Sequence, residues 1–121
     1  MQFMNAFNDD IESNRYSWKI MEGCNFKNCS HIFPTQQRDV QNLLKCWEKD
    51  KNVDKVIIFG SSVTSACNPW SDIDVFVQVK HPVDKFNKPD CVVPFDIWTN
   101  FDVDDRLLAE IMKTGVVVYE Q

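Results

Sequence analysis

Two short apolar stretches in the middle of the chain, residues 54–59 and 73–79, are rich in β-branched and aromatic side chains. Runs of this length and composition predict buried β-strands. Gly60 follows the first stretch, and Asp72 and Asp74 open the second. Because side chains alternate along a strand, the two carboxylates are expected on one face, about 6–7 Å apart.

Helical spacing appears on both sides of these stretches. Apolar residues from Val40 to Trp47 recur on one side of a helix, and Thr35 is the expected N-cap. A second helix is expected over residues 102–113, because this segment is acidic at its start and basic at its end, as the helix dipole favours. Gly115 is expected to end it.

Two further strands are expected towards the C-terminus. Residues 92–99 are mostly apolar, and Pro94 within them favours an edge strand or a bulge, since proline cannot donate a hydrogen bond to a neighbouring strand. Residues 116–119 form a last apolar run. Between the two central strands, residues 61–67 are expected to form a short helix or a turn.

The N-terminal residues 1–34 have a mixed pattern, with apolar residues first at helical spacing and then in alternation. A helix is favoured there, followed by a connection over 22–34. We expect one domain over 1–121, with 1–34 as an N-terminal extension and a core over about 35–120. The elements predict an α/β (α+β) fold, with a small mixed sheet and helices mainly on one face.

Composition narrows the choice of partners. The 121 residues carry a net charge of −5, and the 13 basic side chains are scattered rather than clustered, which disfavours a nucleic-acid partner. No apolar run reaches the length of a membrane span and the N-terminus does not resemble a signal peptide, so a cytoplasmic protein without a membrane partner is expected. Five cysteines, an odd number, favour free thiols.

The central motif has the order strand, Gly60-Ser61, ten residues, Asp72-Ile73-Asp74, and later Asp96 within an apolar strand. This order resembles the nucleotidyltransferase superfamily that includes DNA polymerase beta. The resemblance covers roughly residues 36–120. The small size of the chain makes it most similar to the minimal nucleotidyltransferases of bacteria and archaea.

The resemblance implies a Mg²⁺-dependent transfer of a nucleoside monophosphate, AMP from ATP, to a hydroxyl acceptor, with two Mg²⁺ ions. Asp96 would complete the shell of the second ion and could accept the hydroxyl proton. The implied catalytic and metal-binding residues are Asp72, Asp74 and Asp96. The implied nucleotide- and phosphate-binding residues are Gly60, Ser61 and Ser62.

The chain departs from the family pattern directly after the Gly-Ser pair. Family members commonly have basic residues where this chain has Ser62 and Thr64, which weakens charge stabilisation of the leaving pyrophosphate. Lys55, Arg38 and Arg106 are candidates for a replacement cation.

Two functional hypotheses therefore remain open. Minimal family members resemble antitoxins that nucleotidylate a small helical partner protein, and this is the enzymatic hypothesis. A non-catalytic nucleotide- or partner-binding protein on the same fold is the alternative. The sequence does not predict the oligomeric state.

Two other features have competing interpretations. Cys24, Cys29 and His31 could suggest zinc, but a structural site needs four ligands, and ordinary loop residues are favoured. Trp70, two residues before Asp72, could stack on a nucleobase, although an aromatic side chain that covers the turn is favoured.

Overall fold

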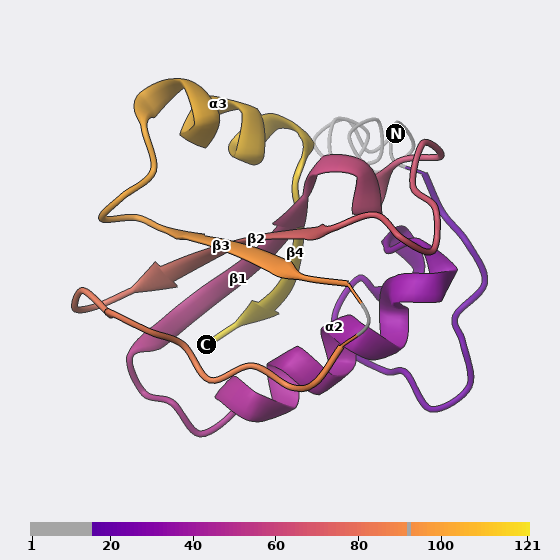
Figure 1. Cartoon of the computed structure of the whole chain (residues 1–121), viewed down its shortest axis with the longest axis horizontal. Helices are drawn as coiled ribbons and strands as arrows, with labels where there is room; N and C mark the ends of the chain where they lie inside the picture. Colours follow the sequence, from indigo (N-terminus) through magenta and orange to yellow (C-terminus); the bar gives the residue numbers. More distant parts are fainter. Residues whose placement is uncertain (1–15, 92) are drawn as a thin grey trace, which may run out of the picture.

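The fold is a four-stranded mixed sheet with a helix on each face, which confirms the predicted α+β class (Figure 1). The computed structural model describes residues 16–91 and 93–121. The strand order is β3-β2-β1-β4; β1 is antiparallel to both β2 and β4, and β2 is parallel to β3. The elements in chain order are η1 Cys29–His31, α2 Pro34–Trp47, β1 Val53–Phe59, η2 Gly60–Val63, β2 Ile73–Val79, β3 Phe95–Thr99, α3 Asp105–Thr114 and β4 Val116–Glu120.

Alternation along the strands divides the core into two hydrophobic clusters. Val56 and Ile58 of β1 belong to the larger cluster, together with Leu43 and the other buried apolar residues of α2. Ile57 and Phe59, on the other face of β1, belong to a smaller cluster that includes Ile111 of α3. The prediction of helices mainly on one face is thus wrong for α3, which covers the face opposite α2 (Figure 1).

Helix α2 begins one residue before the predicted N-cap. Pro34 occupies the start of the helix and Phe33 is the N-cap, without a side-chain capping hydrogen bond. Proline suits this position because its fixed φ is already helical and its missing N–H would have no partner within the helix. The prediction of Thr35 as the cap is therefore wrong.

Helix α3 begins at Asp105, later than the predicted residue 102. Asp104 is its N-cap, and its side chain accepts a hydrogen bond from the Leu107 N–H at 2.7 Å. Asp102 instead accepts from the Thr99 N–H at 2.8 Å and closes the preceding turn. Gly115 ends the helix as expected, where its N–H donates to the Ile111 carbonyl at 2.8 Å.

Strand β3 begins at Phe95, directly after Pro94, and it lies at the edge of the sheet as expected. Proline has no N–H to donate but keeps its carbonyl oxygen. The Pro94 carbonyl accepts from the Ile73 N–H at 3.0 Å, which is the first hydrogen bond to β2. Of the predicted strand over 92–99, residues 93 and 94 are thus not part of β3, and residue 92 lies outside the described residues.

The described part of the N-terminal extension, residues 16–33, has no α-helix and contains only the short η1. The expectation of a helix ahead of the connection over 22–34 is wrong for residues 16–21, and residues 1–15 lie outside the described residues. The segment is held against α2 by side chains, because the Gln37 amide donates to the Lys19 carbonyl and accepts from the Met21 N–H. Within the described part of the chain, no helix has the length and apolar character needed to cross a bilayer.

All five cysteines carry free thiols, as expected. Cys24 and Cys29 are buried in the N-terminal segment. Burial, with Cys24 beside it, raises the pKa of Cys29 to about 11, which keeps this sulfur protonated at neutral pH. His31 contacts the Tyr16 carbonyl through its Nδ1 at 2.8 Å.

Candidate active site

Three predicted aspartates meet at one end of the sheet. Asp74 pairs with Phe59 of β1 on one side and with Asp96 of β3 on the other, so one row crosses three strands. Backbones of neighbouring strands are about 4.8 Å apart, which places Asp74 and Asp96 side by side. Asp72 lies immediately before β2. The structure thus brings together the acids that the sequence predicted.

The acids lie on the face of the sheet that α3 covers. Ile73 and Val75 of β2 belong to the α2-side cluster, whereas Phe76 belongs to the α3-side cluster. By alternation, Asp74 lies on the same face as Phe76. Asp96 lies on the same face as Trp98, whose ring packs against Phe59 with centroids 5.5 Å apart.

Asp74 is the most enclosed of the three, being half-buried while Asp72 and Asp96 are exposed. Burial, followed by the negative charges of Asp96 and Asp72, raises the pKa of Asp74 to about 6. Its carboxylate also lies against Gly60, where an added Cβ would come within 2.3 Å of the Asp74 Oδ2. A side chain at position 60 would therefore displace this carboxylate, and the φ of +75° also favours glycine.

The three carboxylates fit a hard divalent cation by chemistry, because Mg²⁺ prefers carboxylate oxygens and their mutual repulsion would be relieved by a cation. In the present side-chain conformations, no three His, Cys, Asp or Glu residues of the described ranges are grouped closely enough to hold one ion. Asp72 and Asp96 are exposed, and both contribute negative charge at Asp74. These three residues would hold the ions.

The turn after β1 is a short 3₁₀ helix, Gly60–Val63, in which the two serines have different environments. Ser61 is half-buried beside Asp74, as a phosphate-binding residue would be. Ser62 is fully buried, and its hydroxyl donates to the Gln36 side chain. The Ser62 hydroxyl is thus already bonded inside the protein, so the phosphate-binding role predicted for Ser62 would fall to its backbone N–H.

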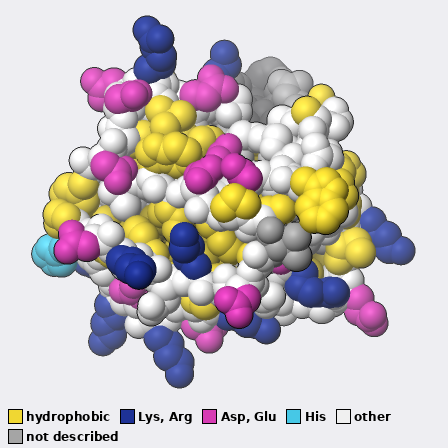
Figure 2. Space-filling model, viewed as in Figure 1, with side chains coloured by type: hydrophobic (Ala, Val, Ile, Leu, Met, Phe, Trp, Pro, Cys, Tyr) yellow, Lys and Arg dark blue, Asp and Glu magenta, His cyan; other side chains and the backbone are white. Residues whose placement is uncertain are grey.

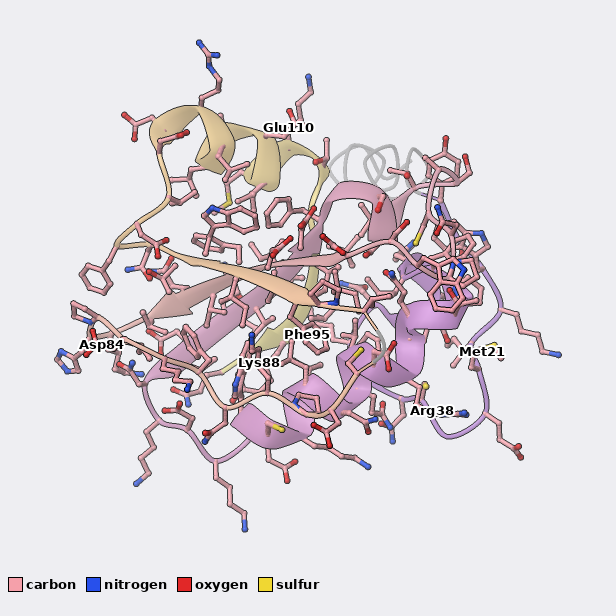
Figure 3. The ribbon with its side chains drawn as sticks, viewed as in Figure 1. Met21, Arg38, Asp84, Lys88, Phe95 and Glu110 are labelled. Atoms are coloured by element: carbon pink, nitrogen blue, oxygen red, sulfur yellow. The ribbon has the colours of Figure 1, made fainter. Side chains whose placement is uncertain are left out.

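Two of the three candidate replacement cations, Arg38 and Lys55, lie away from the Gly60-Ser61 turn. Arg38 donates to the Glu22 carbonyl at 2.7 Å from the α2 side of the sheet (Figure 3). Lys55 forms an ion pair with Glu120 at 3.4 Å, at the opposite end of β1 from Gly60. Arg106 is exposed on α3. Thr64 donates to the Ser61 carbonyl at 3.1 Å and stabilises the turn.

A hollow of about 450 Å³ lies between the Gly60-Ser61 turn, Asp74 and α3. None of the described residues that line it is basic, and acidic side chains lie around the hydrophobic surface below α3 (Figure 2). Sequence reasoning missed the α3 residues, because nothing in the sequence places this helix over the turn. The lining residues are Phe59, Gly60, Ser61, Val63, Thr64, Ala66, Asp74, Leu107, Glu110 and Thr114.

Trp70 lies beside the acids and is 74% exposed. The backbone N–H of Trp70 donates to the Asn68 side chain at 2.8 Å, and the backbone N–H of Ser71 donates to the Asn68 carbonyl at 3.1 Å. This hydrogen-bonded turn exposes the indole ring to solvent. The interpretation of Trp70 as a cover for the turn is therefore wrong.

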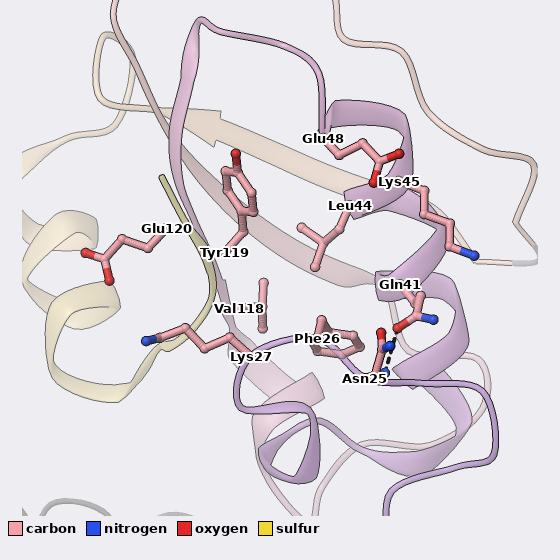
Figure 4. Close-up of a pocket in the computed structure, with 10 residues that line it drawn as sticks. All are labelled: Asn25, Phe26, Lys27, Gln41, Leu44, Lys45, Glu48, Val118, Tyr119 and Glu120. Atoms are coloured by element: carbon pink, nitrogen blue, oxygen red, sulfur yellow. Dashed lines mark hydrogen bonds between the residues drawn. The ribbon is translucent and has the colours of Figure 1, made fainter.

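A second hollow, of about 330 Å³, lies away from the acids, between α2, β4 and the N-terminal segment (Figure 4). Leu44, Phe26 and Tyr119 line it, and Asn25 and Gln41 are joined across it by a hydrogen bond of 2.9 Å. It contains none of the residues of the Gly-Ser and Asp motif, so the hollow beside Asp74 is the candidate active site.

Comparison with known proteins identifies the family of the chain. The family described as "Nucleotidyltransferase domain" matches residues 40–118, which include the Gly60-Ser61 turn and all three aspartates. No curated protein and no solved structure is similar enough to count as a match. Because the matched region covers more than half of the chain, the protein belongs to the nucleotidyltransferase domain family, whose activity is nucleotidyl transfer.

Proposed function

We propose that this protein transfers AMP from ATP to a hydroxyl group, with Mg²⁺, and that the hydroxyl belongs to a small helical partner protein. The observation that carries the proposal is the row of Asp74 and Asp96 across two paired strands, beside the Gly60-Ser61 turn. This places oxygen ligands for a cation next to backbone N–H groups that suit phosphate.

In this proposal, the aspartates and the Gly60-Ser61 turn have different roles. Asp72, Asp74 and Asp96 hold two Mg²⁺ ions, which would neutralise the triphosphate and lower the pKa of the acceptor hydroxyl when bound. Asp96, exposed at the edge strand, accepts the hydroxyl proton. The Ser61 hydroxyl and the N–H groups at the start of η2 bind β- and γ-phosphate oxygens.

The charge of the site supports a metal. A triphosphate is strongly negative, and the described residues that line the hollow include Asp74 and Glu110 but no cation. Like charges within about 4–6 Å repel strongly when water is partly excluded. A nucleotide would therefore bind there together with divalent cations rather than alone.

The choice of a protein acceptor rests on the family resemblance and on the surface beside Asp72. Trp70 is largely exposed within two residues of Asp72, and tryptophan is enriched among the residues that dominate protein interfaces. A small-molecule acceptor would need an enclosing pocket on this side, whereas a partner protein brings its own surface.

A non-catalytic nucleotide-binding protein is the second candidate. The inward-facing Ser62 and the turn-stabilising Thr64 favour it, because both stand where relatives commonly have basic residues. Such a protein would bind Mg²⁺ and ATP without releasing pyrophosphate.

Calorimetric titration of ATP, with and without Mg²⁺, tests the proposal. We expect Mg²⁺-dependent binding by the wild type, and at least about 100-fold weaker binding by the Asp72→Asn/Asp74→Asn double variant. Asp84→Asn/Asp90→Asn is the matched control, since it removes two exposed carboxylates outside the site. Equal binding by the two double variants would refute the site.

Turnover separates the two candidates. Pyrophosphate release in the presence of the partner protein supports the transferase, whereas Mg²⁺-dependent binding without pyrophosphate release supports the binding protein.

A further inference from the structure

Gln36 lies in the first turn of α2, and its side chain joins two segments that build the active site. The residue is only 1% exposed. Its Nε2 donates to the Ser71 carbonyl at 2.6 Å, and its Oε1 accepts from the Ser62 hydroxyl. The donor and the acceptor of this buried amide are therefore both bonded, the donor to Ser71 and the acceptor to Ser62.

The two segments are the phosphate-binding turn and the start of β2. Ser62 directly follows Ser61, and Ser71 directly precedes Asp72. The turn has a second connection to α2, because the Phe33 N–H donates to the Ser62 carbonyl at 2.8 Å. The N-terminus of α2 is thus hydrogen-bonded to the turn on the side away from the hollow.

We propose that Gln36 is a positioning residue that sets the distance between the phosphate-binding turn and the metal-binding aspartates. The inference rests on the proposed function, and it gives α2 a role in holding the turn and the aspartates in position for the reaction. Gln36 touches neither nucleotide nor metal and acts through Ser62 and Ser71.

The chemistry of the amide explains why glutamine is suited to this position. An amide offers a donor and an acceptor at a fixed separation, whereas a carboxylate cannot donate to the Ser71 carbonyl and a thioether bonds strongly to neither partner. Reacting groups must be held in fixed positions, because a displacement of about 1 Å can lower the rate by about 100-fold. Burial excludes water that could replace the lost partner.

Gln37, the next residue in the helix, provides a matched control. It is also fully buried and also bonds through its side-chain amide. Its partners are the Met21 N–H at 2.7 Å and the Lys19 and Ile32 carbonyls at 3.0 Å, all in the N-terminal segment. Loss of the Gln37 amide should therefore cost stability without moving the turn relative to the acids.

The experiment compares Gln36→Met with Gln37→Met, since methionine has a similar length and no strong hydrogen bond. Both variants remove the hydrogen bonds of a buried side-chain amide, so we expect similar falls in Tm of several degrees. For Gln36→Met alone we expect kcat/KM with Mg²⁺ and ATP to fall by about 10–100-fold. Amide hydrogen exchange should become faster in residues 60–64 and 71–74 of this variant only.

The inference is overturned if the two variants lose kcat/KM equally, or if exchange in these two segments stays as in the wild type. If the wild type neither binds nor turns over ATP, the proposed function fails, and hydrogen exchange alone decides the positioning claim. Should Gln36→Met not fold, Ser62→Ala decides, because it removes one of the two bonds. We expect a several-fold loss of kcat/KM for Ser62→Ala, and an unchanged value overturns the inference.

Discussion

The two faces of the sheet differ in what they bury. The α2 face carries the larger cluster, in which Leu43, Val56 and Ile58 are fully buried. Among the described residues, the α3 face has four buried apolar residues, and beside them lie Asp74 and the hollow of about 450 Å³. The comparison indicates that the α2 face supplies most of the stability. This stability offsets the cost of the half-buried Asp74 on the other face.

Truncating one leucine on each face tests this difference most directly. Leu43→Ala should lower the free energy of unfolding by about 3 kcal/mol, because Leu43 is fully buried in the larger cluster. Leu108→Ala on α3 should lower it by only about 1 kcal/mol, since Leu108 is partly exposed. Urea denaturation with unchanged m-values measures both, and equal losses would mean that the faces contribute alike.

Two glycines with the same backbone conformation test the functional side of the comparison. Gly60 and Gly23 have φ of +75° and +85°, so alanine at either should cost about 1–2 kcal/mol of stability. Around Gly23 there is open space, whereas at Gly60 the new methyl group displaces the Asp74 carboxylate. We therefore expect similar stabilities, with loss of Mg²⁺-dependent ATP binding in Gly60→Ala only. Retained binding in that variant would argue against a ligand role for Asp74.

The smallest expected effect concerns the charge of Asp74 itself. Its pKa is about 6 in the folded protein, raised first by burial, so the folded state binds the proton more tightly than the unfolded state does. Without metal, stability should therefore fall as the pH rises from about 4 to about 6, and stay level above that range with respect to this group. Because Asp74 is partly exposed, we expect a change of only about 1 kcal/mol.

Asp74→Asn should remove this part of the pH dependence and raise the stability at pH 7 by about the same 1 kcal/mol, while turnover is lost. Thermal denaturation in the presence of a chelator, at pH 4.5 and pH 7, compares the variant with the wild type. If the variant is less stable than the wild type at pH 7, the ionised Asp74 carboxylate does not destabilise the fold.

Local patterns made the strands and the acids predictable. Apolar runs identified β1 and β2, and alternation placed Asp74 on the opposite face from Ile73. The family resemblance then added Asp96, which lies opposite Asp74 in the register. These features depend on residues close together in the chain or on one recurring motif.

Features that depend on distant partners could not be predicted. The burial of Ser62 depends on Gln36, which lies on another element, and a serine in a turn gives no sign of such a partner. The contribution of Leu107 and Glu110 to the hollow depends on α3 crossing to the second face. Helix boundaries were missed for a local reason, because Asp102 and Asp104 are equally good caps and only the structure shows which one is used.

The central place of β1 has a consequence for the order in which the protein can fold. One neighbour, β2, follows it closely in the chain, but the other, β4, ends at Glu120, opposite Lys55. During synthesis the strands that carry the acids are complete well before β4 leaves the ribosome. One edge of β1 therefore stays open until β4 has been made, and closing this long loop is expected to be a slow step that limits how fast the whole sheet forms.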